Sequence, residues 1–141
     1  MNVEEKYVLT LTRKQAYMVQ DACELFARLK IGQFNRITEH LLDLGLNDYC
    51  ERRDNANDLL RIVSCIIFGR NIYGSPELKQ DETHYRAWDI YTVLRHAMWE
   101  HDNPDPKRRD GWCVFADTPY THTSEPLPEC KVLAGKERAE G

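Results

Sequence analysis

The chain lacks any uninterrupted hydrophobic run long enough to span a bilayer, and its N-terminus, MNVEEKYVLT, lacks the apolar core of a secretion signal. It also lacks a basic excess, since 19 lysines and arginines stand against 23 acidic residues, a formal net charge of −4. These absences predict a protein without a membrane span. They also argue against a partner that is a nucleic-acid polymer, because proteins that bind nucleic-acid polymers carry a strong positive charge.

Cysteine occurs five times, but never with CxxC spacing. Without a close pair of ligands there is nothing to seed a zinc site. Cys23 and Cys65 fall within apolar helical stripes, where a free thiol behaves as a small hydrophobic side chain. We therefore expect free thiols, a reducing cytosolic setting, and no metal or other cofactor.

Complete catalytic motifs are missing as well: no GxSxG, GxGxxG, Walker or HExxH pattern occurs. A two-histidine phosphoesterase needs two H-x-[ST] motifs, one for the base and one for the acid. His122-Thr123-Ser124 supplies only one. His96 and His101 are five residues apart, so they lie on different faces of a predicted helix, which argues against a shared metal ion for hydrolysis. The sequence favours a binding protein over an enzyme, and a nucleotide phosphodiesterase remains the enzymatic alternative.

The 141 residues, 42% of them hydrophobic, suffice for one domain with a core and are too few for two ordinary domains. We predict a single ligand-binding domain over residues 1–133. Residues 134–141, AGKERAEG, are predicted to form a disordered tail.

The first predicted helix spans about 13–30. It begins at a capping box formed by Thr12 and Gln15 and ends at Gly32, which is expected in the left-handed conformation. Its apolar residues form two adjacent stripes, which is more than one neighbouring element can cover. The helix is therefore expected either at the centre of the fold or at a subunit interface. The stripes are Ala16, Val19, Cys23 and Phe26, and Met18, Ala22, Leu25 and Leu29.

Three further helices follow. One is predicted at about 34–44, and the next begins at a cap on Asp54 and ends before Gly69. The last starts at Ser75-Pro76, or settles only after Glu82, and runs to about 101. The stripe predicted for the third helix is Ala56, Leu59, Val63 and Ile66.

The ends of the domain are predicted to be extended. Residues 7–11 alternate with the period of a strand, residues 112–116 can form another, and 125–133 an edge strand limited by proline. The predicted fold class is α+β, with about four helices packed against a small antiparallel sheet of N- and C-terminal strands.

The candidate ligand contacts lie on a loop between two glycines and on the aromatic helix after it. The loop can aim backbone N–H groups at an anion, while indoles stack on flat rings and guanidinium groups hold phosphates. The plainer alternatives are a helix–helix turn and an ordinary core stripe. The candidates are Phe68, Arg70, Asn71, Tyr73, Gly74, Trp88, Arg95 and Trp99, with the turn Lys107, Arg108 and Arg109 able to close over a phosphate or to remain a solvated turn.

Six segments occur in an order that resembles the first type of Thoeris anti-defence protein, over roughly residues 7 to 131. They are LTRKQ, LFARLKIGQF, RRDNANDLL, FGRNIYG, DIYTVLRHAMW and a C-terminal EPLP. The resemblance implies a bacteriophage protein of the host bacterial cytoplasm that binds cyclic ADP-ribose isomers made by immune enzymes. It implies sequestration without hydrolysis.

The resemblance also implies a homo-oligomer, a dimer or a hexamer, with cyclic di- or trinucleotides bound by some hexameric members at a separate site. Arg28 and Gln33 are the candidates for that second site. The remaining alternative is a phage regulator that binds nucleic acid or a host protein. Such a regulator would need a helix with exposed basic residues, and the helix that contains Trp88 is too apolar for that role.

Overall fold

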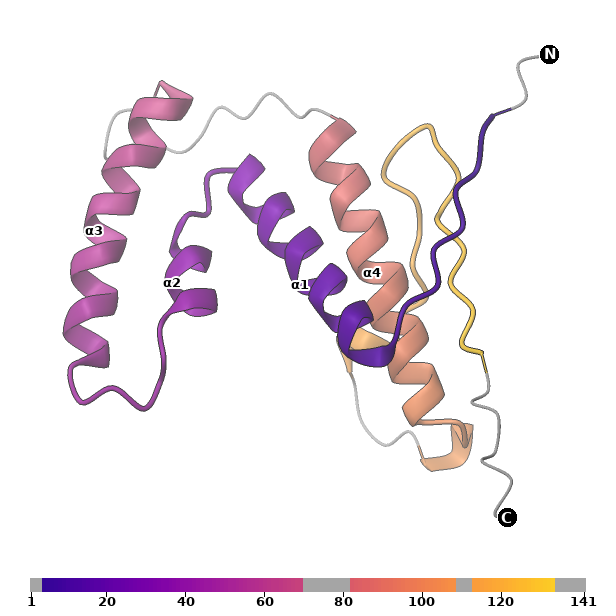
Figure 1. The fold of residues 1–141 in the computed structure, drawn as a ribbon. Coiled ribbons are helices and arrows are strands. Elements are labelled where there is room, and N and C mark those ends of the chain that lie inside the picture. The colour runs from indigo at the N-terminus through magenta and orange to yellow at the C-terminus, as the bar shows by residue number, and fades with distance from the viewer. Residues whose placement is uncertain (1–3, 70–81, 109–112, 134–141) are drawn as a thin grey trace.

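A computed structural model describes residues 4–69, 82–108 and 113–133 of the chain. Its elements are α1 (Arg13–Lys30), α2 (Asn35–Leu41), α3 (Tyr49–Phe68), α4 (Glu82–Asp102) and the short 3-10 helices η1 (Pro106–Arg108) and η2 (Val114–Ala116). Figure 1 shows α1 and α4 side by side and running in opposite directions. α2 lies on the other side of α1, and α3 is the helix farthest from α4.

The described part of the chain is all-helical, so the predicted α+β fold is wrong. Residues 7–11 and 125–133 are extended, but neither segment forms a strand ladder with another described segment. Within 112–116, where a strand was predicted, the structure has η2. Tyr7, Val8 and Leu9 are all exposed, although alternation predicts one buried face. A period of two describes the extended backbone but supplies no partner to pair with it.

The predicted ends of α1 are confirmed. Thr12 Oγ1 accepts a hydrogen bond from the Gln15 amide at 3.3 Å, and the Thr12 amide donates to Gln15 Oε1 at 2.9 Å. This reciprocal pair satisfies two of the amide groups that a helix start leaves open. Gly32, just after the helix, has φ of 82°, the left-handed conformation that glycine adopts without strain.

The third helix differs from its prediction at one end. It stops before Gly69, as predicted, and Gly69 is left-handed with φ of 67°. It begins at Tyr49, so the predicted start at Asp54 is wrong. Asp54 lies inside the helix and pairs with Arg53. The predicted start of the last helix at Ser75-Pro76 lies outside the described residues.

Small side chains fill the contact between α1 and α4, the most extensive contact between described elements. Ala27 of α1 is fully buried and Ala87 of α4 is 8% exposed. The ring of His84 reaches across this contact and donates from Nδ1 to the Ala27 carbonyl at 2.8 Å. Side chains this small let two helix backbones approach closely.

The outer helix α3 is attached to α2 and to the turn that precedes it. Ser64 Oγ donates to the Gly32 carbonyl at 3.0 Å, and Thr38 Oγ1 lies 2.8 Å from Asn57 Oδ1. The stripe predicted for this helix is not buried within the chain, since Leu59, Val63 and Ile66 are exposed. No helix among the described residues is long and apolar enough to cross a membrane.

The close approach of α1 and α4 predicts the effect of enlarging Ala27. Ala27→Leu adds three carbon atoms at a fully buried position, and it should lower the free energy of unfolding by about 1–3 kcal/mol. Urea unfolding measures it. Ala22→Leu, on an exposed position of the same helix, is the matched control and should change stability by less than about 0.5 kcal/mol. Equal stability of both variants would contradict this packing.

Candidate functional site

A guanidinium group and an indole ring are stacked where α1 ends and α4 begins. The Cζ atom of Arg28 lies 4.8 Å from the centre of the Trp88 ring. Arg28 also donates from Nη1 to Gln33 Oε1 at 3.1 Å. A cation over an indole face is the most favourable of the cation–π pairs. Both partners of this pair were predicted as ligand contacts from the sequence.

Two more aromatic rings lie at the same end of the molecule. Phe34, after α1, meets Phe68, the last residue of α3, edge to face with ring centres 6.2 Å apart. In Figure 1 the end of α1, the end of α3 and the start of α4 all lie at the top. We call this group the Arg28–Trp88 cluster. Its members are Arg28, Trp88, Gln33, which accepts from Arg28, and the ring pair of Phe34 and Phe68, which joins the others through the peptide bond between Gln33 and Phe34.

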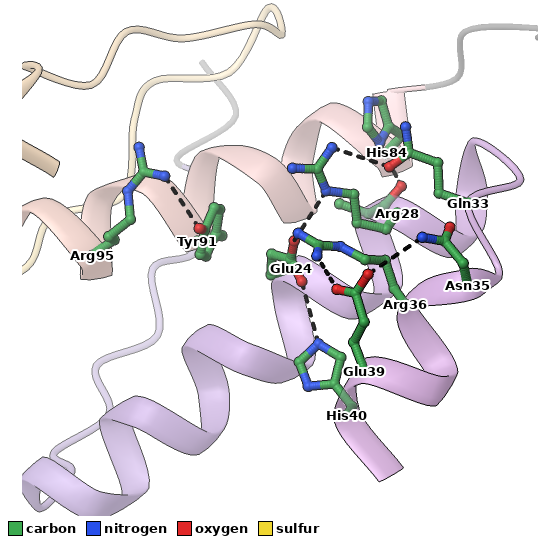
Figure 2. A network of polar contacts seen from close by, with 11 residues as sticks. Glu24, Arg28, Gln33, Asn35, Arg36, Glu39, His40, His84, Tyr91 and Arg95 are labelled. Carbon is green, nitrogen blue, oxygen red and sulfur yellow. Dashed lines mark hydrogen bonds and ion pairs between the residues drawn. The ribbon is translucent and has the colours of Figure 1, made fainter. Parts of the chain in front are cut away.

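A nearly buried carboxylate holds Arg28 in place. Glu24, with 9% of its side chain exposed, accepts from Arg28 Nε at 3.0 Å and from Arg36 Nη2 at 2.8 Å. His40 Nε2 lies 3.4 Å from the second Glu24 oxygen, and Arg36 also pairs with Glu39 (Figure 2). The described contacts of Arg28 engage two of its five N–H donors. The others can donate to an anionic ligand.

The charge state of Glu24 follows from these partners. Burial acts to raise the pKa of Glu24, but hydrogen bonds from Arg28, His40 and Arg36 outweigh it, so the pKa lies below its usual value. The carboxylate therefore remains charged at neutral pH. A charged Glu24 orients Arg28 through Nε, which leaves the Nη side of the fork for other partners.

The other predicted helix residues lie farther along α4. Arg95 and Trp99 follow Trp88 by seven and eleven residues, so they share its side of the helix about 10 and 17 Å away. The guanidinium of Arg95 lies between the rings of Tyr91 and Phe115, 4.9 and 5.1 Å from their centres. It also donates to the Tyr91 hydroxyl at 3.1 Å (Figure 2). These contacts attach η2 to α4.

The remaining predicted residues divide into three groups. Lys107 and Arg108 belong to η1, just after α4. Arg28, assigned from the sequence to a second site, lies against Trp88, assigned to the first, so the two predicted sites meet in one cluster. The residues outside the described part of the chain are Arg70, Asn71, Tyr73, Gly74 and Arg109.

The sequence did not reveal a second polar centre, between Asp89 and His122. Asp89 is 4% exposed, and its carboxylate accepts from His122 Nδ1 at 2.6 Å and from the His122 amide at 3.1 Å. The imidazole stacks on Tyr85 with ring centres 5.7 Å apart. Arg86 pairs with Glu125 alongside at 2.6 Å. The available signal was an acidic residue on an apolar helix together with the isolated H-x-[ST] motif.

These contacts hold the C-terminal segment against α4. The hydrogen atom stays on His122 Nδ1 and is donated to the carboxylate of Asp89. Within the described residues, no group of three or more His, Cys, Asp or Glu side chains is arranged to hold a metal ion.

Comparison of the chain with protein-family models, with curated proteins and with solved structures finds no match.

The lowered pKa of Glu24 predicts a pH-dependent cost of removing its charge. The charged carboxylate contributes stability that is fully present above the unfolded-state pKa, about 4.3, and is lost as pH falls through the lower folded value. At pH 7, Glu24→Gln should lower the free energy of unfolding by about 1.5–3 kcal/mol. The stabilities of wild type and variant should converge as pH falls below about 4.

Urea unfolding at a series of pH values tests this dependence. The control is Glu39→Gln, whose side chain is 43% exposed and pairs with Arg36 at the surface. That variant should change stability by less than about 1 kcal/mol at every pH. A gap between wild type and Glu24→Gln that stays constant from pH 7 to 3 would contradict the assignment.

Proposed function

We propose that the protein binds and sequesters a cyclic ADP-ribose isomer without hydrolysing it, and that the Arg28–Trp88 cluster is the binding site. The observation that carries the proposal is a guanidinium fixed over an indole by a nearly buried carboxylate. Arg28 then offers directed N–H donors to a pyrophosphate, and the cluster's aromatic rings offer flat apolar surface to adenine.

The chemistry of the cluster supports recognition more than turnover. Its members are one guanidinium, one amide and three aromatic rings. None of these is a nucleophile or a base that titrates near neutral pH. The resemblance to Thoeris anti-defence proteins points to the same ligand class, to a bacteriophage protein acting in the host cytoplasm, and to a homo-oligomer. Cyclic di- or trinucleotides also carry anionic phosphates and flat bases, and they are the second class of ligand to test.

A release experiment tests sequestration. The protein is incubated with a cyclic ADP-ribose isomer, separated from free ligand, and heat-denatured, and the released compound is identified by mass spectrometry. The expected result is unchanged ligand, bound with a Kd of about 1 µM or tighter. Linear ADP-ribose formed in proportion to the protein would contradict sequestration, and failure to retain the ligand would contradict binding.

Two substitutions locate the site. Arg28→Lys keeps the charge but removes the planar fork, and it should weaken binding roughly 10- to 100-fold through loss of charge-assisted hydrogen bonds. Trp88→Leu removes the stacking surface and should weaken binding roughly 5- to 100-fold. Calorimetric titration measures both, and thermal melting verifies that each variant is folded.

The chain offers matched controls. Arg53 also lies over an aromatic ring, 5.7 Å from the centre of Tyr49, at the opposite end of α3 from the cluster. Arg53→Lys should leave the ligand affinity unchanged. Arg95→Lys tests the other half of α4, where the guanidinium already lies between two rings. Weakening by Arg95→Lys with no effect of Arg28→Lys would move the site along α4 and contradict the proposed cluster.

One observation favours a second candidate function, a nucleotide phosphodiesterase. His122 Nδ1 donates a hydrogen bond to Asp89, which leaves Nε2 as the ring nitrogen that can accept a proton from a nucleophile, as a general base does. If this candidate is right, the release experiment returns product, and His122→Gln abolishes the product while ligand still binds. If sequestration is right, His122→Gln releases intact ligand, as wild type does.

A further inference from the structure

The outer side of α3 carries an apolar stripe that the described part of its own chain does not cover. The stripe consists of five side chains, exposed by between 41% and 74%. We call it the outer stripe, and its members are Leu59, Ile62, Val63, Ile66 and Ile67.

The opposite side of α3 carries the contacts to the rest of the chain, and two of these contacts are polar. Ser64 donates to the Gly32 carbonyl, and Asn57 meets Thr38. A helix at the surface of a monomer normally has the reverse arrangement, with its apolar stripe inward and its polar side chains in water. Soluble monomers rarely expose a contiguous apolar patch of this kind, so the outer stripe marks an interface.

We propose that α3 pairs antiparallel with α3 of a second copy of this chain, across a two-fold axis. The positions 59, 62, 63 and 66 have the same spacing when they are counted in either direction. An antiparallel partner therefore presents an identical stripe, with Leu59 facing Ile66 of the other copy and Ile62 facing Val63. This self-complementarity is what a two-fold contact between identical surfaces requires.

The charges along α3 permit this pairing. Between Leu59 and Phe68 the only charged residue is Arg61. The helix turns about 100° per residue, so Arg61 and Ile66 lie on opposite sides of Ile62, and the guanidinium is turned away from the centre of the stripe. The two copies can approach along the stripe without bringing like charges into contact.

The size of the contact suits a weak, transient interface. With Leu59 opposite Ile66, the two helices overlap over residues 57–68, about 18 Å of a helix about 11 Å across, so half of the overlapping wall presents on the order of 300 Å². Two copies together bury about 600 Å², which is the size of a transient contact. We therefore expect a pair that is populated at about 100 µM and dissociates on dilution, unless other contacts add to it.

Light scattering coupled to size exclusion tests the pairing at about 100 µM, a concentration at which a transient pair is populated. The expected mass is twice that of the 16.6 kDa chain, or a higher even multiple. Leu59→Arg and Ile66→Asp should each give smaller assemblies with an unchanged helical circular-dichroism spectrum, because both positions are exposed in the single chain. Leu44→Arg, at an equally accessible leucine outside the stripe, should keep the wild-type mass.

The double variant Leu59→Arg with Ile66→Asp tests the antiparallel register. In that register each introduced guanidinium faces an introduced carboxylate of the partner, so the larger assembly should return. A parallel pair would instead bring like charges together and would stay apart. The proposal is overturned if wild type has the single-chain mass at about 100 µM, if the single variants keep the wild-type mass, or if the double variant stays dissociated.

Discussion

The carboxylate of Glu24 is the interaction on which the arrangement of the first two helices depends, and it positions the arginine that the first helix places over Trp88 of the fourth. It is nearly buried, and the free-energy cost of removing its charge from water is offset only if the carboxylate is fully paired. Arg28 supplies one partner from the same helix, and Arg36 and His40 supply two from α2. Arg28 in turn lies over Trp88 of α4. A single buried charge thus fixes the angle of α2 against α1 and sets the orientation of the proposed ligand contact.

The attachment of α3 follows a different principle. Its described inner contacts include hydrogen bonds and one edge-to-face ring pair, while most of its leucine, isoleucine and valine side chains are exposed. Burial of apolar surface normally supplies most of the stability of a helix packing. The described chain therefore leaves α3 short of the burial that its composition can provide. The proposed partner copy on the outer stripe would supply it without changing the contacts to α2.

The parts of the fold that local chemistry determines were predicted from the sequence. The Thr12–Gln15 capping box, the left-handed Gly32 and the end of α3 before Gly69 depend on residues within one turn of each other, and all three are confirmed. The sheet was not predicted correctly, because alternation over residues 7–11 cannot say whether a partner strand exists. Of the site, the sequence identified Arg28 and Trp88 as separate candidates. Their contact depends on the packing of α1 against α4 and on Glu24, neither of which has a local pattern.

The proposed assembly and the proposed ligand site meet at the end of α3. Phe68 closes that helix, directly after Ile67 of the outer stripe, and contacts Phe34 of the Arg28–Trp88 cluster. The last turn of a helix frays most readily when nothing packs over it. A second copy seated on Ile66 and its neighbours would hold this turn, and with it the ring of Phe68, in the position that the cluster needs. The entropy cost of ordering this turn would then be offset by the free energy of assembly and would not reduce the free energy of ligand binding. In this way a small protein with a single layer of helices can still offer a preformed site.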